Sequence, residues 1–442
     1  MLHSRFSRIT AILFASATIF SSCQKDLDVQ SADIDQLRVR GANGGNMSSL
    51  AAVGRQIFFD NKMSNPVGSQ SCASCHMPNV GFSGLGDGPG FVQGVGQGAV
   101  PGAFGGRKPP SAAYATFAPQ MTLDIPPADP ADPAPPVPEF TGGLFWDGRA
   151  TGLRLGSAAA EQALGPFLNP AEHNVADKQT ILNNIKSSNY YSLWLAAFNN
   201  EPIDVSTPAL VDANYDKVGR AIAAYEATPE VNKFSSKFDA YMKGQVRLTD
   251  QEARGLALFN DQAECYDCHE SVSADGVVPA LFTDWSYHNI GLPMNMNTPN
   301  KLNLLKPDKG LGGELETMLE NGRPKYSAEW RAQAPLQYGK FKTPTLRNVA
   351  VGSNRRYMHN GILNSLEAVV HFYNTRDVPG AGWTFDGVFK TWAQLGREVD
   401  MNVEIHGAGN LGLTAQQEAD IVAFMKTLSD GWNASTGVTT VL

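Results

Sequence analysis

Two short cysteine motifs carry the most specific chemistry in the sequence. One reads Cys72-Ala73-Ser74-Cys75-His76 and the other reads Cys265-Tyr266-Asp267-Cys268-His269. Each is a Cys-x-x-Cys-His pattern, which is typical of covalent attachment of a c-type haem. Two thiols three positions apart on a turning backbone reach the two vinyl groups of one porphyrin, and the next His is then placed to bind the iron. The sequence therefore predicts two covalently bound c-type haems, with His76 and His269 as iron ligands.

Two other uses of paired cysteines fit the sequence less well. A Cys₄ zinc site does not require a His after each pair, and the two pairs lie in opposite halves of the chain. A redox-active Cys-x-x-Cys is expected in a thioredoxin-like strand–helix–strand context, which neither flank provides. Haem attachment is therefore the favoured interpretation.

Helical patterns precede each motif and close each half of the chain. Apolar residues at helical spacing precede the first motif at 50–57, and a capping box at 249–252 opens a similar stripe before the second. The first half ends with an apolar-periodic segment at 218–225 and the second with one at 414–428. This order of helix, motif, loop and closing helix is typical of a cytochrome c domain, and it occurs twice.

Length and composition predict two domains. A chain of 442 residues is too long for one compact core, and 43 Gly and 27 Pro predict long irregular loops. We expect a mostly α protein of two cytochrome c-like domains with one haem in each. The expected boundaries are 1–22 for a signal peptide, 23–46 for a flexible tether, 47–243 for the N-terminal domain and 244–442 for the C-terminal domain. The net charge of −8 argues against a nucleic-acid partner.

The N-terminal residues resemble an export signal. Arg5 and Arg8 precede an apolar stretch at 11–20, which is too short to span a membrane but suits a secretory signal. Small residues directly before Cys23 resemble a bacterial lipoprotein cleavage site, whereas the alternative is an ordinary signal peptide with an unrelated Cys. We expect a periplasmic protein that is anchored to a membrane by a lipid on Cys23.

Further segments outside the cysteine motifs carry a family resemblance. They are Phe145-Trp146-Asp147-Gly148-Arg149-Ala150, Glu161-Gln162-Ala163-Leu164-Gly165-Pro166, His288-Asn289-Ile290-Gly291, Phe341-Lys342-Thr343-Pro344-Thr345-Leu346-Arg347-Asn348, Tyr357-Met358-His359-Asn360-Gly361 and Leu366-Glu367-Ala368-Val369-Val370. Together they make the chain resemble the bacterial di-haem cytochrome c peroxidase family, including its MauG-like branch. The resemblance extends over most of the sequence after the N-terminal tether.

The resemblance implies roles for three residues near the first haem. Glu172 corresponds to the family's distal acid, which moves a proton between the two oxygens of peroxide. Gln162 corresponds to an amide that orients peroxide or water by hydrogen bonding. Trp146 corresponds to a residue that lies between the two haems and assists electron transfer. The alternatives are a solvated Glu172 and a core aromatic at Trp146.

The axial ligands separate the branches of the family. Many members close the resting first haem with a distal His soon after the first motif, but no His lies between His76 and His173. We therefore expect an open position, as in the MauG-like branch. At the second haem, Tyr373 corresponds to the other axial ligand, and Met358 is the rival candidate. A phenolate ligand stabilises ferric and higher iron states more than a thioether does.

A calcium site between the haems, which is common in the family, is doubtful in this sequence. The family uses an Asn in an Arg-Asn-Ala-Pro segment, and that segment here reads Arg107-Lys108-Pro109-Pro110. The second calcium segment reads Asn354-Arg355-Arg356. Two lining positions have thus become basic, and a lysine ammonium could occupy the place of the cation, although backbone carbonyls could still coordinate calcium.

The resemblance implies a di-haem peroxidase that reduces hydrogen peroxide to water at the N-terminal haem. Electrons would reach it through the C-terminal haem from a small redox protein. A MauG-like oxidase, which uses peroxide to modify side chains of a partner protein, is one alternative, favoured by Tyr373 and the missing distal His. A plain di-haem electron-transfer cytochrome is another, against which Gln162 and Glu172 argue.

Overall fold

The computed structural model describes residues 47–440, except 128–135, 301–305, 321 and 353–354. The expected signal peptide (1–22) and tether (23–46), with Cys23, lie outside the described residues. Within the described ranges, no helix is both long and apolar enough to cross a membrane.

Most of the regular structure is helical, which confirms the prediction of a mostly α protein. The helices of the described residues are α2 (Ser49–Phe59), α3 (Cys72–Cys75), α4 (Ala158–Leu168), α5 (Lys178–Lys186), α6 (Tyr191–Ala197), α7 (Pro208–Glu226), α8 (Lys237–Met242), α9 (Asp250–Asn260), α10 (Gly310–Thr317), α11 (Ala328–Ala332), α12 (Leu366–Thr375), α13 (Trp392–Leu395) and α14 (Ala415–Lys426). Segments without regular structure, such as 97–114 and 142–157, connect them.

The strands are short and form antiparallel pairs. The pairs are β1 (Phe91–Val92) with β2 (Val95–Gly96), β3 (Thr122–Asp124) with β4 (Glu139–Thr141), β5 (Tyr287–His288) with β8 (Phe341–Lys342), β6 (Leu319–Glu320) with β7 (Arg323–Pro324), β9 (Gly382–Phe385) with β10 (Val388–Thr391) and β11 (Trp432–Asn433) with β12 (Val438–Thr439). Each pair joins two loop segments by backbone hydrogen bonds, and the described residues form no larger sheet.

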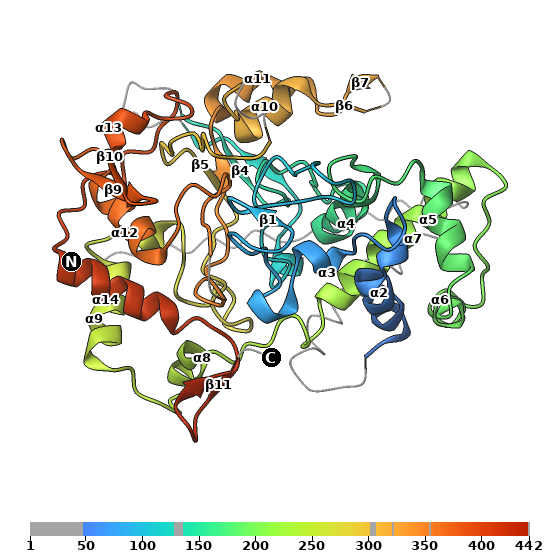
Figure 1. Cartoon of the computed structure of the whole chain (residues 1–442), viewed down its shortest axis with the longest axis horizontal. Coiled ribbons are helices and arrows are strands. Elements are labelled where there is room, and N and C mark those ends of the chain that lie inside the picture. The colour runs from blue at the N-terminus through green and yellow to red at the C-terminus, as the bar shows by residue number, and fades with distance from the viewer. Residues whose placement is uncertain (1–46, 128–135, 301–305, 321, 353–354, 441–442) are drawn as a thin grey trace, which may run out of the picture.

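Two helix pairs at opposite ends of the molecule frame the cysteine motifs (Figure 1). Helix α2 precedes the first motif and packs on α7, and α9 precedes the second motif and packs on α14. Each crossing is so close that it requires a glycine at the contact point. A Cβ on Gly54 would overlap the backbone of Ala221, and a Cβ on Gly255 would overlap that of Asp420. The repeated pattern in the sequence therefore folds into the same close crossing twice.

Each crossing helix contributes an aromatic side chain to a core of its own. Phe58, four residues after the first glycine, is buried in the first core, and Phe259 takes the equivalent place in the second. Rings from distant segments surround Phe259, with Phe282 and Phe424 at centroid distances of 6.3 and 5.1 Å. Burial of one such side chain stabilises the fold by roughly 1.5–3 kcal/mol.

Segments near the middle of the chain bind the two halves together. Phe238 of α8 packs in the second core, and the next residue, Asp239, forms a buried ion pair of 2.8 Å with Arg347. A second contact also joins the two halves, since the Tyr114 hydroxyl of the first half donates to Asp430 Oδ2 of the second at 2.6 Å. The boundary expected at 243/244 stays a prediction, and α8, which precedes it, packs with the second half.

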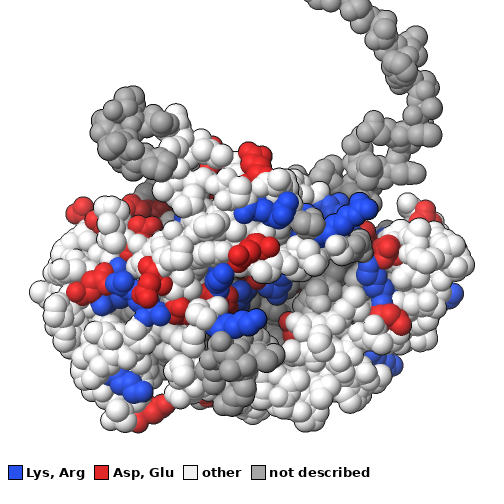
Figure 2. Space-filling view, turned by 90° about the horizontal axis from the view of Figure 1, so that it is seen from above, with Lys and Arg blue, Asp and Glu red and all other residues white. Residues whose placement is uncertain are grey.

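Charges of both signs are scattered over the face that is viewed from the side of α10 and α11. Figure 2 shows basic and acidic side chains interspersed over this face. Such a face creates no extended field of one sign, which would be needed to steer a highly charged polymer.

Substitution of the crossing glycines tests the duplicated packing. We expect Gly54→Ala and Gly255→Ala each to lower the free energy of unfolding of the haem-loaded protein by about 1–3 kcal/mol, since the added methyl forces the helices apart. Intrinsic helix propensity alone predicts the opposite sign, a gain of roughly 0.5–1 kcal/mol. Urea denaturation measures the change. A gain in stability from the two helix variants would refute the close crossings.

Two candidate haem sites

The first cysteine motif lies beside a large cavity. Helix α3 turns the chain so that Cys75 and His76 line a cavity of about 780 Å³, and this first cavity also receives residues from α4 and α10. Nδ1 of His76 lies 3.4 Å from the Phe82 carbonyl. Since a carbonyl only accepts, Nδ1 carries the hydrogen, and Nε2 keeps its lone pair for a metal.

The second motif repeats this arrangement. Cys265, Cys268 and His269 line a second cavity of about 400 Å³. Nδ1 of His269 lies 2.8 Å from the carbonyl of Phe282. Phe82 and Phe282 both adopt left-handed backbone conformations, with φ of 53° and 55°. Bulky residues rarely adopt this conformation, so the shared geometry reflects a shared task.

The chemistry of both sites fits a c-type haem. Burial lowers the pKa of His76 to about 4 and also lowers that of His269, which keeps each imidazole neutral, the form that binds iron. Both volumes lie in the range of roughly 300–1,000 Å³ that is usual for cofactor pockets. Gly96 lines the first cavity, where a Cβ would come within 3.0 Å of Cys75 Sγ. A glycine at this position therefore keeps the space beside the thiol open.

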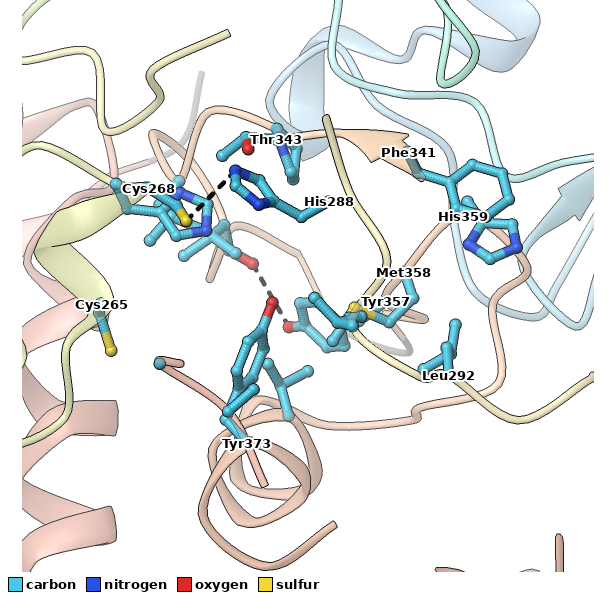
Figure 3. Close-up of a pocket in the computed structure, with 18 of the residues that line it drawn as sticks. Cys265, Cys268, His288, Leu292, Phe341, Thr343, Tyr357, Met358, His359 and Tyr373 are labelled. Atoms are coloured by element: carbon cyan, nitrogen blue, oxygen red, sulfur yellow. Dashed lines mark hydrogen bonds between the residues drawn. The ribbon is translucent and has the colours of Figure 1, made fainter. Parts of the chain in front are cut away.

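The Cys₄ zinc alternative does not fit the structure. Among the described residues, the group of metal-type ligands within 4.8 Å of one another is Cys268, Asp284 and His288. This group contains a single thiol and no member of the first cysteine pair. Figure 3 shows His288 pointing toward Cys268, where its Nε2 lies 3.5 Å from Sγ.

Gln162 and Glu172 line the first cavity together with His76. Gln162 lies on α4, and Glu172 follows the end of that helix, where Asn169 Nδ2 donates to Glu172 Oε1 at 2.7 Å. Burial raises the pKa of Glu172 by more than the Arg149 charge and the Asn169 hydrogen bond lower it. The protonated acid therefore persists to higher pH than in an exposed glutamate.

His76 is the one histidine among the described residues that line the first cavity. His173, the next His along the chain, is buried elsewhere. Its Nδ1 lies 2.7 Å from the Met63 carbonyl, and its ring packs at 5.1 Å from that of Phe167. The absence of a distal His in the sequence is thus matched in this lining, although an open iron position stays a prediction.

Trp146 lines both cavities. Its Nε1 donates to the Lys108 carbonyl at 2.8 Å, which fixes the plane of the indole. The ring lies 6.4 Å from that of His359, between centroids, and His359 in turn stacks on Phe341 at 3.5 Å. An aromatic path therefore lies between the two cavities, where the family resemblance predicts an electron-transfer residue.

Tyr373 and Met358 both line the second cavity (Figure 3). Tyr373 lies on α12, whereas Met358 lies in a loop with a left-handed φ of 69°. Burial, and next the nearby thiols Cys268 and Cys265, raise the pKa of Tyr373 well above that of an exposed tyrosine. A phenolate at this position thus requires a positive partner such as a metal ion.

Comparisons with known proteins test the family resemblance. The sequence model of the di-haem cytochrome c peroxidase family matches residues 48–247. The chain is 32% identical over 328 residues to the methylamine utilization protein MauG of Paracoccus denitrificans, with 74% of each chain covered. The chain belongs to the di-haem cytochrome c peroxidase family. The family predicted from the sequence is therefore confirmed.

Other relatives represent the peroxidases of the family. The cytochrome c551 peroxidase of Pseudomonas aeruginosa is 27% identical over 320 residues, which cover 72% of this chain and 69% of that protein. The crystal structure of the diheme peroxidase BthA from Burkholderia thailandensis superposes with a TM-score of 0.69 at 30% identity, over 90% of each chain. A di-haem family implies two c-type haems, as the motifs predict, and the covalent bonds themselves stay a prediction.

Sequence analysis missed an ion cluster in the first cavity. Arg107 forms an ion pair with Asp308 at 2.7 Å and another with Asp147, and Arg149 pairs with Asp147 at 2.8 Å. Arg149 also covers the Phe145 ring at 3.6 Å. Arg107, Asp147 and Arg149 lie in segments that were compared with the family, so their charges could have indicated an ion cluster. Asp308 lies in a distant loop, and no sequence pattern indicated that it joins the cluster.

Substitution at the second cavity decides between the two candidate ligands. We expect Tyr373→Phe to change the absorption and electron paramagnetic resonance spectra of the second haem, because it removes the oxygen ligand. Met358→Leu, in the same cavity, should leave both spectra unchanged. The reverse pattern would transfer the ligand role to Met358.

Proposed function

We propose that this family member reduces hydrogen peroxide to water in the first cavity, with electrons relayed through the second. The observation that carries the proposal is the joint lining of one cavity by His76, Gln162 and Glu172. A cavity that holds an iron ligand, a hydrogen-bonding amide and a carboxyl group of raised pKa combines the groups that peroxide cleavage requires.

The residues of the first cavity supply protons and orientation. When bound, the haem supplies an iron that exchanges electrons with peroxide. Peroxide accepts two electrons and two protons and yields two water molecules. Glu172, whose pKa is raised by burial, is suited to give a proton to the departing oxygen, and the Asn169 hydrogen bond holds the carboxyl group in place. Gln162 offers an amide that orients the attacking or leaving oxygen.

Trp146 is suited to pass electrons between the cavities. It lines both of them, and its hydrogen bond to the Lys108 carbonyl restrains the orientation of the ring. The electron donor in this proposal is a small redox protein that delivers electrons to the second haem. The likeness to the cytochrome c551 peroxidase supports a small redox protein as the electron donor.

A MauG-like oxidase is the second candidate. Tyr373 in the second cavity favours it, since a phenolate stabilises oxidised iron, as does the 32% identity to MauG. In this reading, peroxide supplies the oxidising equivalents that modify side chains of a partner protein. A plain electron-transfer cytochrome is disfavoured, because it has no use for the partly buried acid Glu172.

We further propose that the protein works in the periplasm, after export directed by residues 1–22 and with a lipid tether on Cys23. The basis is the sequence pattern at 5–23. The Cys-x-x-Cys-His motifs agree with export, since bacteria attach c-type haem outside the cytoplasm.

Glu172→Gln tests the proposed acid. The amide keeps the size and much of the hydrogen bonding but cannot transfer a proton, so peroxide turnover should fall about 10²–10⁴-fold while both haem spectra stay nearly unchanged. Steady-state turnover with a reduced electron donor provides the measurement. Glu316→Gln is the matched control, because Glu316 lines the same cavity but is 43% exposed and pairs with Lys309. Full turnover in Glu172→Gln would remove Glu172 from the mechanism.

A further inference from the structure

Lys108 stands at the junction of the two cavities. It lines both of them, and only 6% of its surface is exposed. Its ammonium group donates to Ser83 Oγ at 2.9 Å and to the Pro109 carbonyl at 3.3 Å. Its backbone N–H donates to the His359 carbonyl at 2.8 Å. The segment at 107–110 is therefore fixed against the loop at 355–359.

Arg355 brings a second positive charge to the same place. Its Nη1 donates to the Val80 carbonyl at 2.8 Å, and it lines the second cavity together with Lys108. The two cations are anchored on one short segment, because Ser83, which accepts from Lys108, and Val80, which accepts from Arg355, lie three positions apart. Consistently, burial and after it the charge of Arg355 lower the pKa of Lys108. The neighbouring Arg356 differs, since Asp87 neutralises it at 2.9 Å.

No carboxylate of the described residues lies within salt-bridge distance of Lys108 or Arg355. Buried cations without a protein counterion are costly unless an anion enters the site. Haem carries two propionate carboxylates, so a haem in the cavity that both side chains line would supply the missing negative charge. We therefore expect the two cations to be stabilised once haem is bound.

The same arrangement leaves no place for the calcium ion that the family often binds between its haems. Ca²⁺ takes six to eight oxygen ligands. The oxygens that surround the two cationic groups, Ser83 Oγ and the carbonyls of Pro109 and Val80, accept hydrogen bonds from Lys108 and Arg355. A divalent cation would also be repelled by both side chains.

We propose that Lys108 and Arg355 form a built-in cation pair that takes the place of calcium between the two haem cavities, so that this protein couples its haems without Ca²⁺. The proposal rests on the presence of two haems and not on the proposed peroxidase activity. Its tests use metal content, spectra and potentials, so its failure is distinguishable from a loss of turnover.

The first test uses the unaltered holoprotein. We expect no stoichiometric calcium by elemental analysis, no saturable heat of binding when CaCl₂ is titrated in, and no change in either haem spectrum after treatment with EGTA. One calcium per chain whose removal changes a haem spectrum would overturn the proposal.

The second test removes the central charge. In Lys108→Met, the midpoint potentials of both haems should fall in a spectroelectrochemical titration, since loss of a nearby positive charge favours the ferric state. The matched control is Lys342→Met: Lys342 is also buried and donates to a carbonyl, but it lines the second cavity alone, so only the second potential should shift. Unchanged potentials in Lys108→Met with full haem content would refute the charge role. If that variant does not fold, the calcium measurements on the unaltered protein still decide the proposal.

Discussion

A hydrogen bond from Nδ1 to a backbone carbonyl orients the imidazole of each motif histidine, at Phe82 in the first half and at Phe282 in the second. A c-type haem needs a neutral, oriented imidazole, and this bond sets both the tautomer and the direction of Nε2. The two phenylalanines that provide these carbonyls adopt a strained, left-handed backbone conformation. The glycine crossings of α2 with α7 and of α9 with α14 then fix the helices that lead into the motifs.

The region between the cavities explains how two such sites work as one unit. Lys108 accepts from Trp146 through its carbonyl, donates to His359 through its N–H and lines both cavities. The residue whose side chain sets the charge here therefore also positions the aromatic residues between the cavities through its backbone. Substitution of the Lys108 side chain keeps both backbone groups, so its main effect is expected to be electrostatic.

Local motifs made the haem-attachment segments and the helices around them predictable from the sequence. The cysteine pairs, the helices before them and the closing helices depend on short-range spacing, and the structure contains these helices near the expected positions. Gln162, Glu172 and Trp146 required the family resemblance, because one carboxyl or indole among many has no local signature. The structure brings all three to the first cavity.

Other features depend on contacts between distant segments, which spacing does not encode. Examples are the ion pair of Arg107 with Asp308, the placement of Lys108 and Arg355 in one cavity, and the packing of α8 with the second core. The left-handed conformations of Phe82 and Phe282 also carry no sequence signal, since phenylalanine does not favour them. Tertiary packing imposes them.

The central claim is that the first cavity admits peroxide directly to an iron held by His76. The most direct measurement adds one equivalent of hydrogen peroxide to the purified diferric protein and follows the Soret band. We predict a rapid shift without prior reduction, because no second histidine lines the described part of that cavity; a long-lived oxidised product would favour the MauG-like candidate. The absence of any shift until one haem has been reduced would contradict the open site, and its absence even after reduction would contradict peroxide chemistry altogether.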